Sequence, residues 1–181
     1  MDSLIKQLKN IFKRGYIPSR HNASYSGQSA SGEKIENLTN CFTHCFNIAN
    51  EDLQHMNLTN ETASWIKIGT VIYEDFFLDE EKTAKNLFDY VRKVGLEVEE
   101  YPVDGLLKKN EWRVALYFRY PLFDNGDYHF LLQEKDGSWT EKVGKSPTVT
   151  SIAYLPKRIH GLFGYDLYKT YKITNPYAEA E

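Results

Sequence analysis

The sequence predicts a single α+β domain in which helices pack on an antiparallel sheet. Three observations support this prediction. The chain has 181 residues, a length that suits one hydrophobic core. Apolar residues recur at helical spacing in several segments before Gly95, whereas they alternate with polar residues after it. Aromatic residues, which favour strands, make up 14% of the chain.

The composition excludes several classes of protein. The formal net charge is −3, so the chain lacks the basic footprint of a nucleic-acid-binding protein, and we expect no nucleic-acid partner. Two cysteines are too few for a disulfide scaffold. No segment approaches the roughly 20 apolar residues of a membrane span, and charges interrupt the apolar residues at the N-terminus, unlike in a signal peptide. We therefore expect a cytoplasmic protein, or one delivered by a secretion route that needs no signal peptide.

The first 34 residues are expected to precede the main domain. Residues 1–18 form a basic amphipathic helix that ends near Gly15 and Pro18, and residues 19–34, rich in Ser, Gly and Asn, form a flexible linker or loop. The α+β domain then spans residues 35–181. The N-terminal helix either packs on that domain or serves as an arm that binds a membrane surface or a partner.

Two further helices are expected. One begins at Cys41, with Thr39 or Asn40 as its N-cap, because the apolar residues and both thiols recur there at helical spacing. The other extends from Asp79 to Gly95. It begins with acidic residues, carries an apolar stripe and ends at a glycine, which is the usual order along a helix that packs on a core.

Strands are expected where apolar and polar residues alternate. Asp136 and Gly137 form a typical hairpin turn, so the segments on either side of them pair as antiparallel strands. In chain order we expect an antiparallel meander with a further strand near the C-terminus. The expected strands cover residues 96–101, 112–119, 128–135, 139–143 and 165–174.

Cys41 is the candidate nucleophile. A thiol in the first turn of a helix lies near unpaired backbone N–H groups, which favour the thiolate over the thiol. The same N–H groups stabilise a developing oxyanion. The alternative is that Cys41 and Cys45, which lie one turn apart, are small buried apolar residues.

His129 is the candidate base among the five histidines. It lies within a strand, on the face that it shares with Leu131, where a rigid sheet aims its ring. His44 ranks second, because a base on the nucleophile's own helix points away from a substrate at the helix end. We expect no cofactor and no metal: a zinc site of Cys41, His44 and Cys45 would lack both the usual ligand spacing and a second cluster.

The helix start and the histidine strand follow one another in a distinctive order. The run Asn40-Cys41-Phe42 starts a helix, and a later strand carries Asp127-Tyr128-His129-Phe130, followed by a hairpin and a polar residue twelve positions after the histidine. This order resembles the papain-like fold in its NlpC/P60-type form, and also a group of uncharacterised bacterial and phage proteins. The similarity covers about residues 37–150. It implies a helix bearing the cysteine, packed on an antiparallel sheet bearing the histidine.

Glu141 stands where the NlpC/P60 pattern commonly has a second histidine that orients the first. The resemblance gives Glu141 that role, since a carboxylate also accepts a hydrogen bond from imidazole. A two-residue turn at Asp136-Gly137 aims Glu141 away from His129, whereas a three-residue loop over residues 136–138 places both on one face. The alternative is a solvated Glu141 on an exposed hairpin.

The resemblance implies a cysteine peptidase or amidase, or an acyltransferase, that acts on a peptide or another amide. In that mechanism Cys41 attacks the carbonyl, His129 transfers the proton and Glu141 holds the ring. The competing interpretation is a protein-binding or inhibitory effector of bacterial or phage origin that uses the same scaffold without turnover. The chain has 13 tyrosines, and tyrosine-rich surfaces suit protein recognition.

Overall fold

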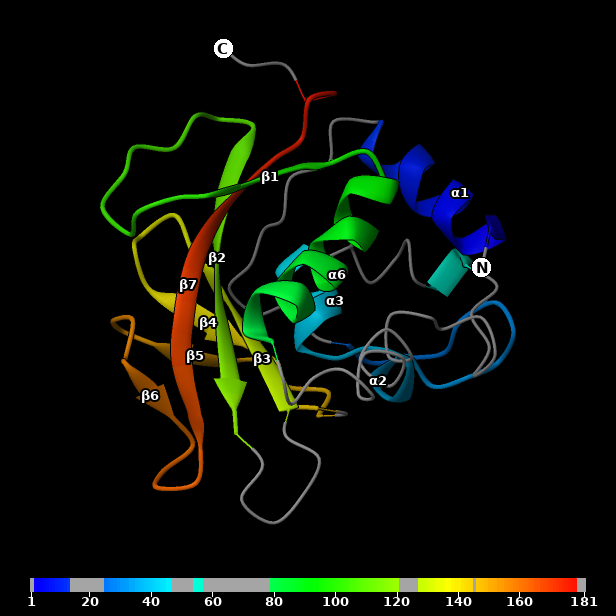
Figure 1. The fold of residues 1–181 in the computed structure, drawn as a ribbon. Helices are drawn as coiled ribbons and strands as arrows, with labels where there is room; N and C mark the ends of the chain where they lie inside the picture. The colour runs from blue at the N-terminus through cyan, green and yellow to red at the C-terminus, as the bar shows by residue number, and fades with distance from the viewer. Residues whose placement is uncertain are drawn as a thin grey trace.

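A computed structural model describes residues 2–13, 25–46, 54–56, 79–120, 127–144 and 146–178 of the chain. Its helices lie together on one side of a twisted sheet, as Figure 1 shows. The described helices are α1 (Asp2–Phe12), α2 (Ile35–Leu38), α3 (Cys41–Phe46) and α6 (Glu80–Lys93). The described strands are β1 (Glu97–Glu100), β2 (Glu111–Arg119), β3 (Asp127–Gln133), β4 (Trp139–Glu141), β5 (Thr150–Ile152), β6 (Arg158–Ile159) and β7 (Tyr165–Thr174). The expected α+β class is confirmed.

The described strands form one seven-stranded sheet with the order β1-β7-β2-β3-β4-β5, in which β6 also pairs with β7. All of these pairings are antiparallel. Strands β2 to β5 follow one another as the expected meander, but β1 and β2 are not neighbours. The ten-residue β7 lies between them and pairs with β2 along its length. The expected meander is therefore wrong at β1, because the C-terminal strand lies between β1 and β2.

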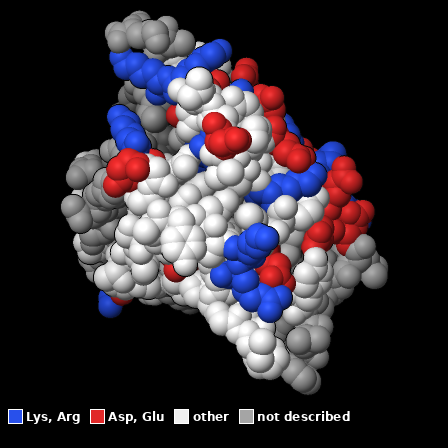
Figure 2. Space-filling view, turned by 90° about the vertical axis from the view of Figure 1, so that its left-hand side faces the viewer, with Lys and Arg blue, Asp and Glu red and all other residues white. Residues whose placement is uncertain are grey.

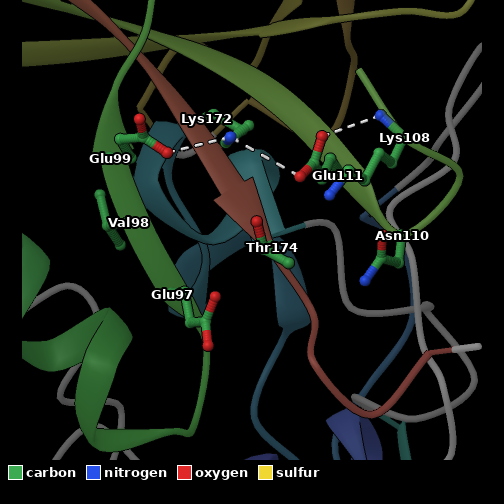
Figure 3. Close-up of a pocket in the computed structure, with 8 residues that line it drawn as sticks. All are labelled: Glu97, Val98, Glu99, Lys108, Asn110, Glu111, Lys172 and Thr174. Carbon is green, nitrogen blue, oxygen red and sulfur yellow. Dashed lines mark hydrogen bonds and ion pairs between the residues drawn. The ribbon is translucent and has the colours of Figure 1, made fainter. Parts of the chain in front are cut away.

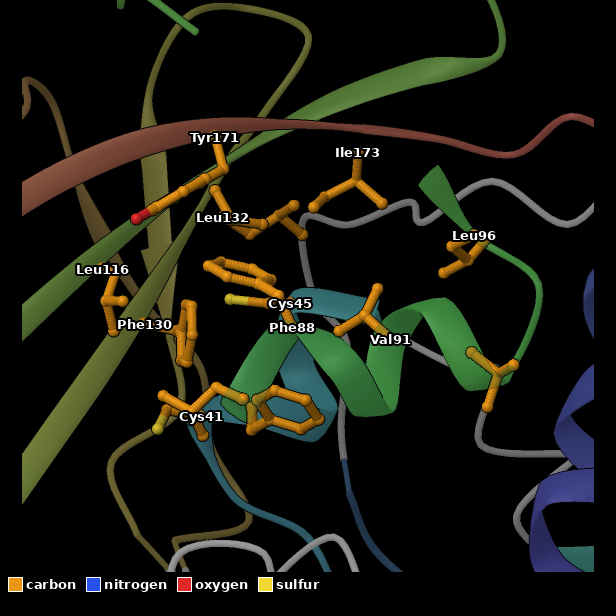
Figure 4. Close-up of a cluster of buried hydrophobic side chains, with 14 of the residues drawn as sticks. Cys41, Cys45, Phe88, Val91, Leu96, Leu116, Phe130, Leu132, Tyr171 and Ile173 are labelled. Carbon is orange, nitrogen blue, oxygen red and sulfur yellow. The ribbon is translucent and has the colours of Figure 1, made fainter. Parts of the chain in front are cut away.

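The helices cover one face of the sheet and enclose the main core. The residues of β2 on this face alternate along the strand, as its period of two requires, and are Trp112, Val114, Leu116 and Phe118. Figure 4 shows part of this cluster, with side chains of α3 and α6 packed against β3 and β7. Phe88 of α6 meets Phe130 of β3 edge to face, with ring centroids 5.9 Å apart. The buried aromatic rings thus fix the helices on the sheet.

The opposite face of the sheet is also covered. A smaller cluster lies there, made of Ala115, Tyr117, Leu131, Trp139 and Ile159. Because residues of both faces are buried, the middle of β2 is buried without a break. His129 lies on this second face, which it shares with Leu131 as the sequence predicts.

Helix α6 begins and ends as its sequence predicts. The Asp79 side chain accepts a hydrogen bond from the backbone N–H of Lys82, at 3.0 Å, and so caps the first turn. Gly95 has a φ of +96°, the left-handed conformation that commonly follows the last turn of a helix. The buried stripe between these ends includes Ala84, Leu87, Phe88 and Val91.

Helix α1 packs on the domain, which is one of the two roles expected for it. Leu8, Ile11 and Phe12 are buried in the main core. The side-chain amide of Asn175, just after β7, donates to the carbonyl of Phe12 at 3.0 Å. Of the expected linker, residues 19–24 lie outside the described residues. The domain boundaries expected at residues 18 and 34 stay predictions.

Charges of both signs are mixed on the surface. Figure 2 shows one side of the molecule, where basic and acidic side chains surround a wide uncharged area. Several charged side chains of the described residues form ion pairs, including Lys169 with Glu100 at 2.7 Å and Lys172 with Glu99 at 2.9 Å. Among the helices of the described ranges, none combines the length and the apolar character that a membrane span needs.

Candidate active site

Cys41 is the first residue of α3, as the sequence predicts. The side-chain oxygen of Asn40 accepts a hydrogen bond from the backbone N–H of Thr43, at 3.2 Å, which is the geometry of a helix cap. Near the other end of the helix, the indole N–H of Trp112 donates to the carbonyl of Cys45 at 3.0 Å. These two hydrogen bonds fix the start of α3 and anchor its end on β2.

A buried lysine also holds the start of α3. The Lys142 side chain is fully buried, and its Nζ donates to the carbonyls of Thr39, at 2.9 Å, and Gly144, at 2.6 Å. Burial lowers the pKa of Lys142 to about 8, against the opposing effect of negative charge at Cys41 and Glu36. Lys142 directly follows β4, so it ties the end of that strand to the segment that precedes the nucleophile.

The two cysteines have different surroundings. Cys45 is fully buried, and in Figure 4 it lies among the aromatic and aliphatic side chains of the main core. Burial, with charge at Cys41 and Glu134, raises the pKa of the Cys45 thiol well above its usual value. Cys41 lies at the margin of the cluster drawn in Figure 4, and 6% of it is exposed. The alternative role of a small buried apolar residue suits Cys45, whereas Cys41, which is also buried in this core, interacts in addition with His129.

The His129 ring lies between Cys41 and Glu141. Burial by itself lowers the pKa of His129, but the charge of a Cys41 thiolate and its hydrogen bond to the ring raise it, and so do the hydrogen bond and charge of Glu141. The net effect raises the pKa of His129 to about 10. The ring is therefore an imidazolium at neutral pH, beside the Cys41 sulfur.

The hairpin between β3 and β4 determines the side on which Glu141 lies. Its loop is residues 135–137, closed by a hydrogen bond from the N–H of Glu134 to the carbonyl of Ser138 at 2.8 Å. Gly137 adopts the left-handed conformation, with a φ of +86°, that the last residue of such a loop requires. Both expected turns, at residues 136–137 and at residues 136–138, are therefore wrong in position.

The observed register nevertheless brings Glu141 to the face of His129. Leu132 pairs with Thr140, so continuing the pairing by one residue sets Glu141 opposite Leu131, which shares its face with His129. This is the outcome expected from a three-residue loop. Because the loop lies one residue earlier than expected, the partner of Glu141 moves by two residues, from Gln133 to Leu131. A shift of two residues along a strand keeps the same face.

Glu141 accepts hydrogen bonds from two imidazoles. An ionised carboxylate only accepts, so the Nε2–H groups of His129, at 2.8 Å, and of His160, at 3.1 Å, both donate to its Oε2. Burial raises the pKa of Glu141, but the hydrogen bonds and charges of the two rings outweigh this and lower it. Only 4% of Glu141 is exposed, so the alternative of a solvated side chain on an open hairpin is wrong.

His160 is a member of the site that the sequence did not reveal. It lies in the turn between β6 and β7, with a left-handed φ of +60°, and its ring centroid is 5.3 Å from that of His129. It reaches Glu141 because β6 folds back on β7, pairing Ile159 with Tyr165. In the sequence, His160 stands out only because it precedes Gly161, which suggests a turn. Its separation from Glu141 along the chain does not predict that the two residues meet.

His44, ranked second as a base, belongs to a separate buried network. The Thr140 hydroxyl donates its one proton to Glu134 at 2.7 Å, so it accepts from His44 Nε2–H at 3.0 Å. His44 Nδ1 then accepts from the hydroxyl of Tyr25 at 3.1 Å. Burial, with the positive charges of Lys142 and His129, lowers the pKa of His44 to about 3. A neutral ring with both nitrogens engaged is neither the base nor a metal ligand.

A cavity of about 460 Å³ lies away from these residues, at the ends of β1, β7 and β2, and Figure 3 shows its lining. Three of its charged side chains pair with one another. Lys172 contacts Glu99 at 2.9 Å and Glu111 at 3.7 Å, and Glu111 also accepts the backbone N–H of Lys108 at 2.8 Å. The lining of this cavity includes neither thiol and none of the described imidazoles, so the candidate site for thiol chemistry is the one around Cys41.

The residues around Cys41 together have the parts of a thiol-dependent acyl-transfer site. They supply a nucleophile in the first turn of a helix, a charged imidazole beside it and a carboxylate that holds the imidazole. The sequence predicts all three of these residues, and the structure adds His160 and Lys142. A comparison with models of known protein families gives no match, and a comparison with curated proteins gives none either.

Proposed function

We propose that the protein is a cysteine-dependent hydrolase of the papain-like, NlpC/P60-type class, a peptidase or amidase that acts on an amide bond. Transfer of the acyl group to an acceptor other than water uses the same residues. The observation that carries the proposal is the single line of contacts from Cys41 through His129 to Glu141. Because Glu141 occupies Nε2 of the ring, the hydrogen bond with the Cys41 sulfur uses Nδ1.

The mechanism starts from the thiolate and the imidazolium. The Cys41 sulfur attacks the amide carbonyl, and the negative charge moves onto the carbonyl oxygen, near the backbone N–H of Cys41 at the start of α3. When the C–N bond breaks, His129 Nδ1–H protonates the departing amine. The product of this half of the reaction is a thioester on Cys41 with a neutral His129.

Water completes the reaction. Neutral His129 accepts a proton at Nδ1 from water, whose oxygen attacks the thioester carbonyl. The carboxylic acid leaves, and the thiolate and imidazolium form again. Throughout, Glu141 holds Nε2–H at 2.8 Å, so the ring keeps Nδ1 directed at the reacting atoms.

The proposal is tested by trapping the acyl-enzyme. The purified protein is treated with p-nitrophenyl acetate, and the site of acetylation is mapped by mass spectrometry. We expect a single acetyl group on Cys41, a Cys45→Ser variant that acetylates like the wild type, and a Cys41→Ser variant that is not labelled at residue 41. A His129→Ala variant should acetylate and deacetylate more slowly, by a factor on the order of 100 to 10,000.

Two results would count against the proposal. Equal labelling of Cys45 and Cys41 would mean that neither thiol is activated by its surroundings. An acetyl group that stays on Cys41, with no release of acetate, would favour the competing interpretation of a protein-binding effector that uses the scaffold without turnover.

A further inference from the structure

Two imidazoles and a carboxylate come together around Glu141. His129 comes from β3, Glu141 from β4 and His160 from the turn after β6. One donor atom from each of the three lies within 4.8 Å of the others. We propose that His129, Glu141 and His160 form a binding site for one divalent transition-metal ion, best matched by Zn²⁺.

The spacing of the donor atoms suits a tetrahedral ion. Ligands at about 2.1 Å from Zn²⁺ lie about 3.4 Å from one another in a tetrahedron. Two of the three pairs are already close to that separation, since Glu141 Oε2 is 2.8 Å from His129 Nε2 and 3.1 Å from His160 Nε2. An ion therefore replaces two N–H protons, and the third pair, the two imidazole nitrogens, already lies within 4.8 Å.

The chemistry of the donors selects the class of ion. Imidazole nitrogen is a poor ligand for Mg²⁺ and Ca²⁺, which take oxygen, and a good one for Zn²⁺ and its neighbours. Two histidines and one glutamate leave the fourth position of a tetrahedron for water. Zn²⁺ also has no redox chemistry, so it binds without oxidising the nearby Cys41 thiol.

The site is formed in advance and has one open side. The side chains of His129 and Glu141 are each 6% exposed, whereas that of His160 is 34% exposed, so the ion enters past His160. The backbone at His160 is left-handed, with a φ of +60°, a conformation that is unfavourable for a residue other than glycine. The fold tolerates this conformation and thereby holds the His160 ring against the buried carboxylate.

Zinc binding has a consequence for catalysis, and this consequence, unlike the binding itself, rests on the proposed function. A bound ion occupies Nε2 of His129 and takes Glu141 as its own ligand. With the ion on Nε2, the Nδ1–H of the ring is a weaker acid than that of an imidazolium, so it protonates the departing amine more slowly. The site is therefore inhibitory, and removal of the ion restores the catalytic arrangement.

The test measures Zn²⁺ binding directly, by competition between the full chain and a chromophoric chelator. We expect one ion per chain. A His160→Asn variant should bind more weakly by a factor on the order of 100, since it loses a ligand. Asparagine tolerates a positive φ, so this change spares the backbone. His55→Asn, at an exposed histidine outside the site, should bind as the wild type does.

The cysteine variants separate this proposal from the proposed function. Cys41→Ser and Cys45→Ser should both keep the Zn²⁺ affinity, although Cys41→Ser loses acetylation. With Co²⁺ as the probe, the absorption spectrum should lack the intense thiolate-to-metal band of a cysteine ligand, a measurement on the wild type that does not depend on how His160→Asn folds.

Three results overturn the metal site: no stoichiometric binding, an unchanged affinity in folded His160→Asn, or a loss of binding in Cys41→Ser accompanied by a thiolate band in the wild type. None of these results bears on the proposed hydrolase function, which the acyl-enzyme experiment tests independently. Conversely, a chain that binds Zn²⁺ through His160 but never acetylates Cys41 keeps the metal site and loses the hydrolase.

Discussion

The hydrogen bonds of Glu141 explain how a buried carboxylate stays charged. Removing it from water raises its pKa, and the two imidazole N–H groups that point at its Oε2 reverse that effect. The negative charge then helps to keep the His129 imidazolium, whose raised pKa of about 10 depends on both Glu141 and Cys41. The charges of three neighbouring side chains are therefore interdependent.

Glu141→Gln tests this dependence. Glutamine keeps an acceptor for His129 Nε2–H but removes the negative charge, so the pKa of His129 should fall. The imidazolium that stabilises a thiolate at Cys41 is then less favoured. We expect alkylation of Cys41 by iodoacetamide at mildly acidic pH to slow by about tenfold, one pKa unit of lost interaction. Asp89→Asn, which removes an exposed carboxylate on α6, should leave the rate unchanged.

His44 predicts a specific dependence of stability on pH. Its pKa is about 3 in the folded protein, against about 6.5 when unfolded. Between these values the unfolded chain binds a proton that the folded protein does not. The free energy of unfolding should therefore fall as the pH drops through this window, by up to about 1.4 kcal/mol per pH unit from this residue.

The comparison of wild type with His44→Gln isolates that contribution. Glutamine retains one donor and one acceptor but does not titrate, so the variant should show a shallower fall in the free energy of unfolding between about pH 6 and about pH 4. Urea denaturation at several pH values measures it. Parallel curves for the two proteins would show that His44 takes up its proton without unfolding.

How much of the site could be predicted depends on how each residue is positioned. Cys41 follows from local signals, since Asn40 and the helical spacing lie beside it, and His129 follows from strand alternation. The role of Glu141 came from the resemblance, and its orientation depended on a loop whose position the sequence leaves open. His160 was beyond reach, because it meets Glu141 only through the pairing of β6 with β7.

At the scale of elements, the β3–β4 hairpin decides whether the site exists. A register slip of one residue would turn Glu141 to the other face of the sheet, away from His129. The loop depends on Gly137, whose φ is +86°. A Cβ added there would lie more than 4 Å from every atom other than those of Gly137 and its chain neighbours. A substitution there meets a conformational cost and no steric clash.

Gly137→Ala should therefore lower the free energy of unfolding by about 1 kcal/mol, the cost of a left-handed conformation for a residue with a Cβ. Gly137→Asn should cost less, because asparagine adopts this conformation more readily. The urea midpoint, at a constant slope, measures both changes. Equal midpoints for all three proteins would mean that the loop does not need the left-handed residue.

The placement of β7 shows where prediction of the elements fails. Alternation predicted that residues 165–174 form a strand, and this is confirmed. Which strands it joins is a matter of long-range packing. Its partner β2 is separated from it in sequence by β3, β4, β5 and β6, and period-two alternation carries no information about such pairings.

At the scale of the whole molecule, the two ends of the chain close the main core together. Phe12 of α1 is fully buried in that core, and Asn175 after β7 binds its carbonyl. The α+β class followed from composition and periodicity. The packing of α1 in the main core did not follow from the sequence. The polar segment between α1 and α2 has the composition of a linker, and that composition is the same whether or not α1 packs on the domain.

Phe12→Ala should destabilise the protein by about 3 to 5 kcal/mol, the usual effect of removing a buried aromatic ring. Lys9→Ala, on the exposed side of the same helix, should change the free energy of unfolding by less than about 0.5 kcal/mol. Chemical denaturation of both variants provides the comparison. Similar small effects would mean that α1 is an appendage of the domain.

The pH dependence of Cys41 alkylation tests the central claim most directly. In a Cys45→Ser background Cys41 is the remaining thiol, and iodoacetamide is small enough for a sulfur that is only 6% exposed. The account predicts that the rate at mildly acidic pH is lower in His129→Ala than in the wild type, because the variant lacks the imidazolium that pairs with the sulfur. A rate that rises about tenfold per pH unit, like that of a free thiol, and that is the same with and without His129, would contradict it.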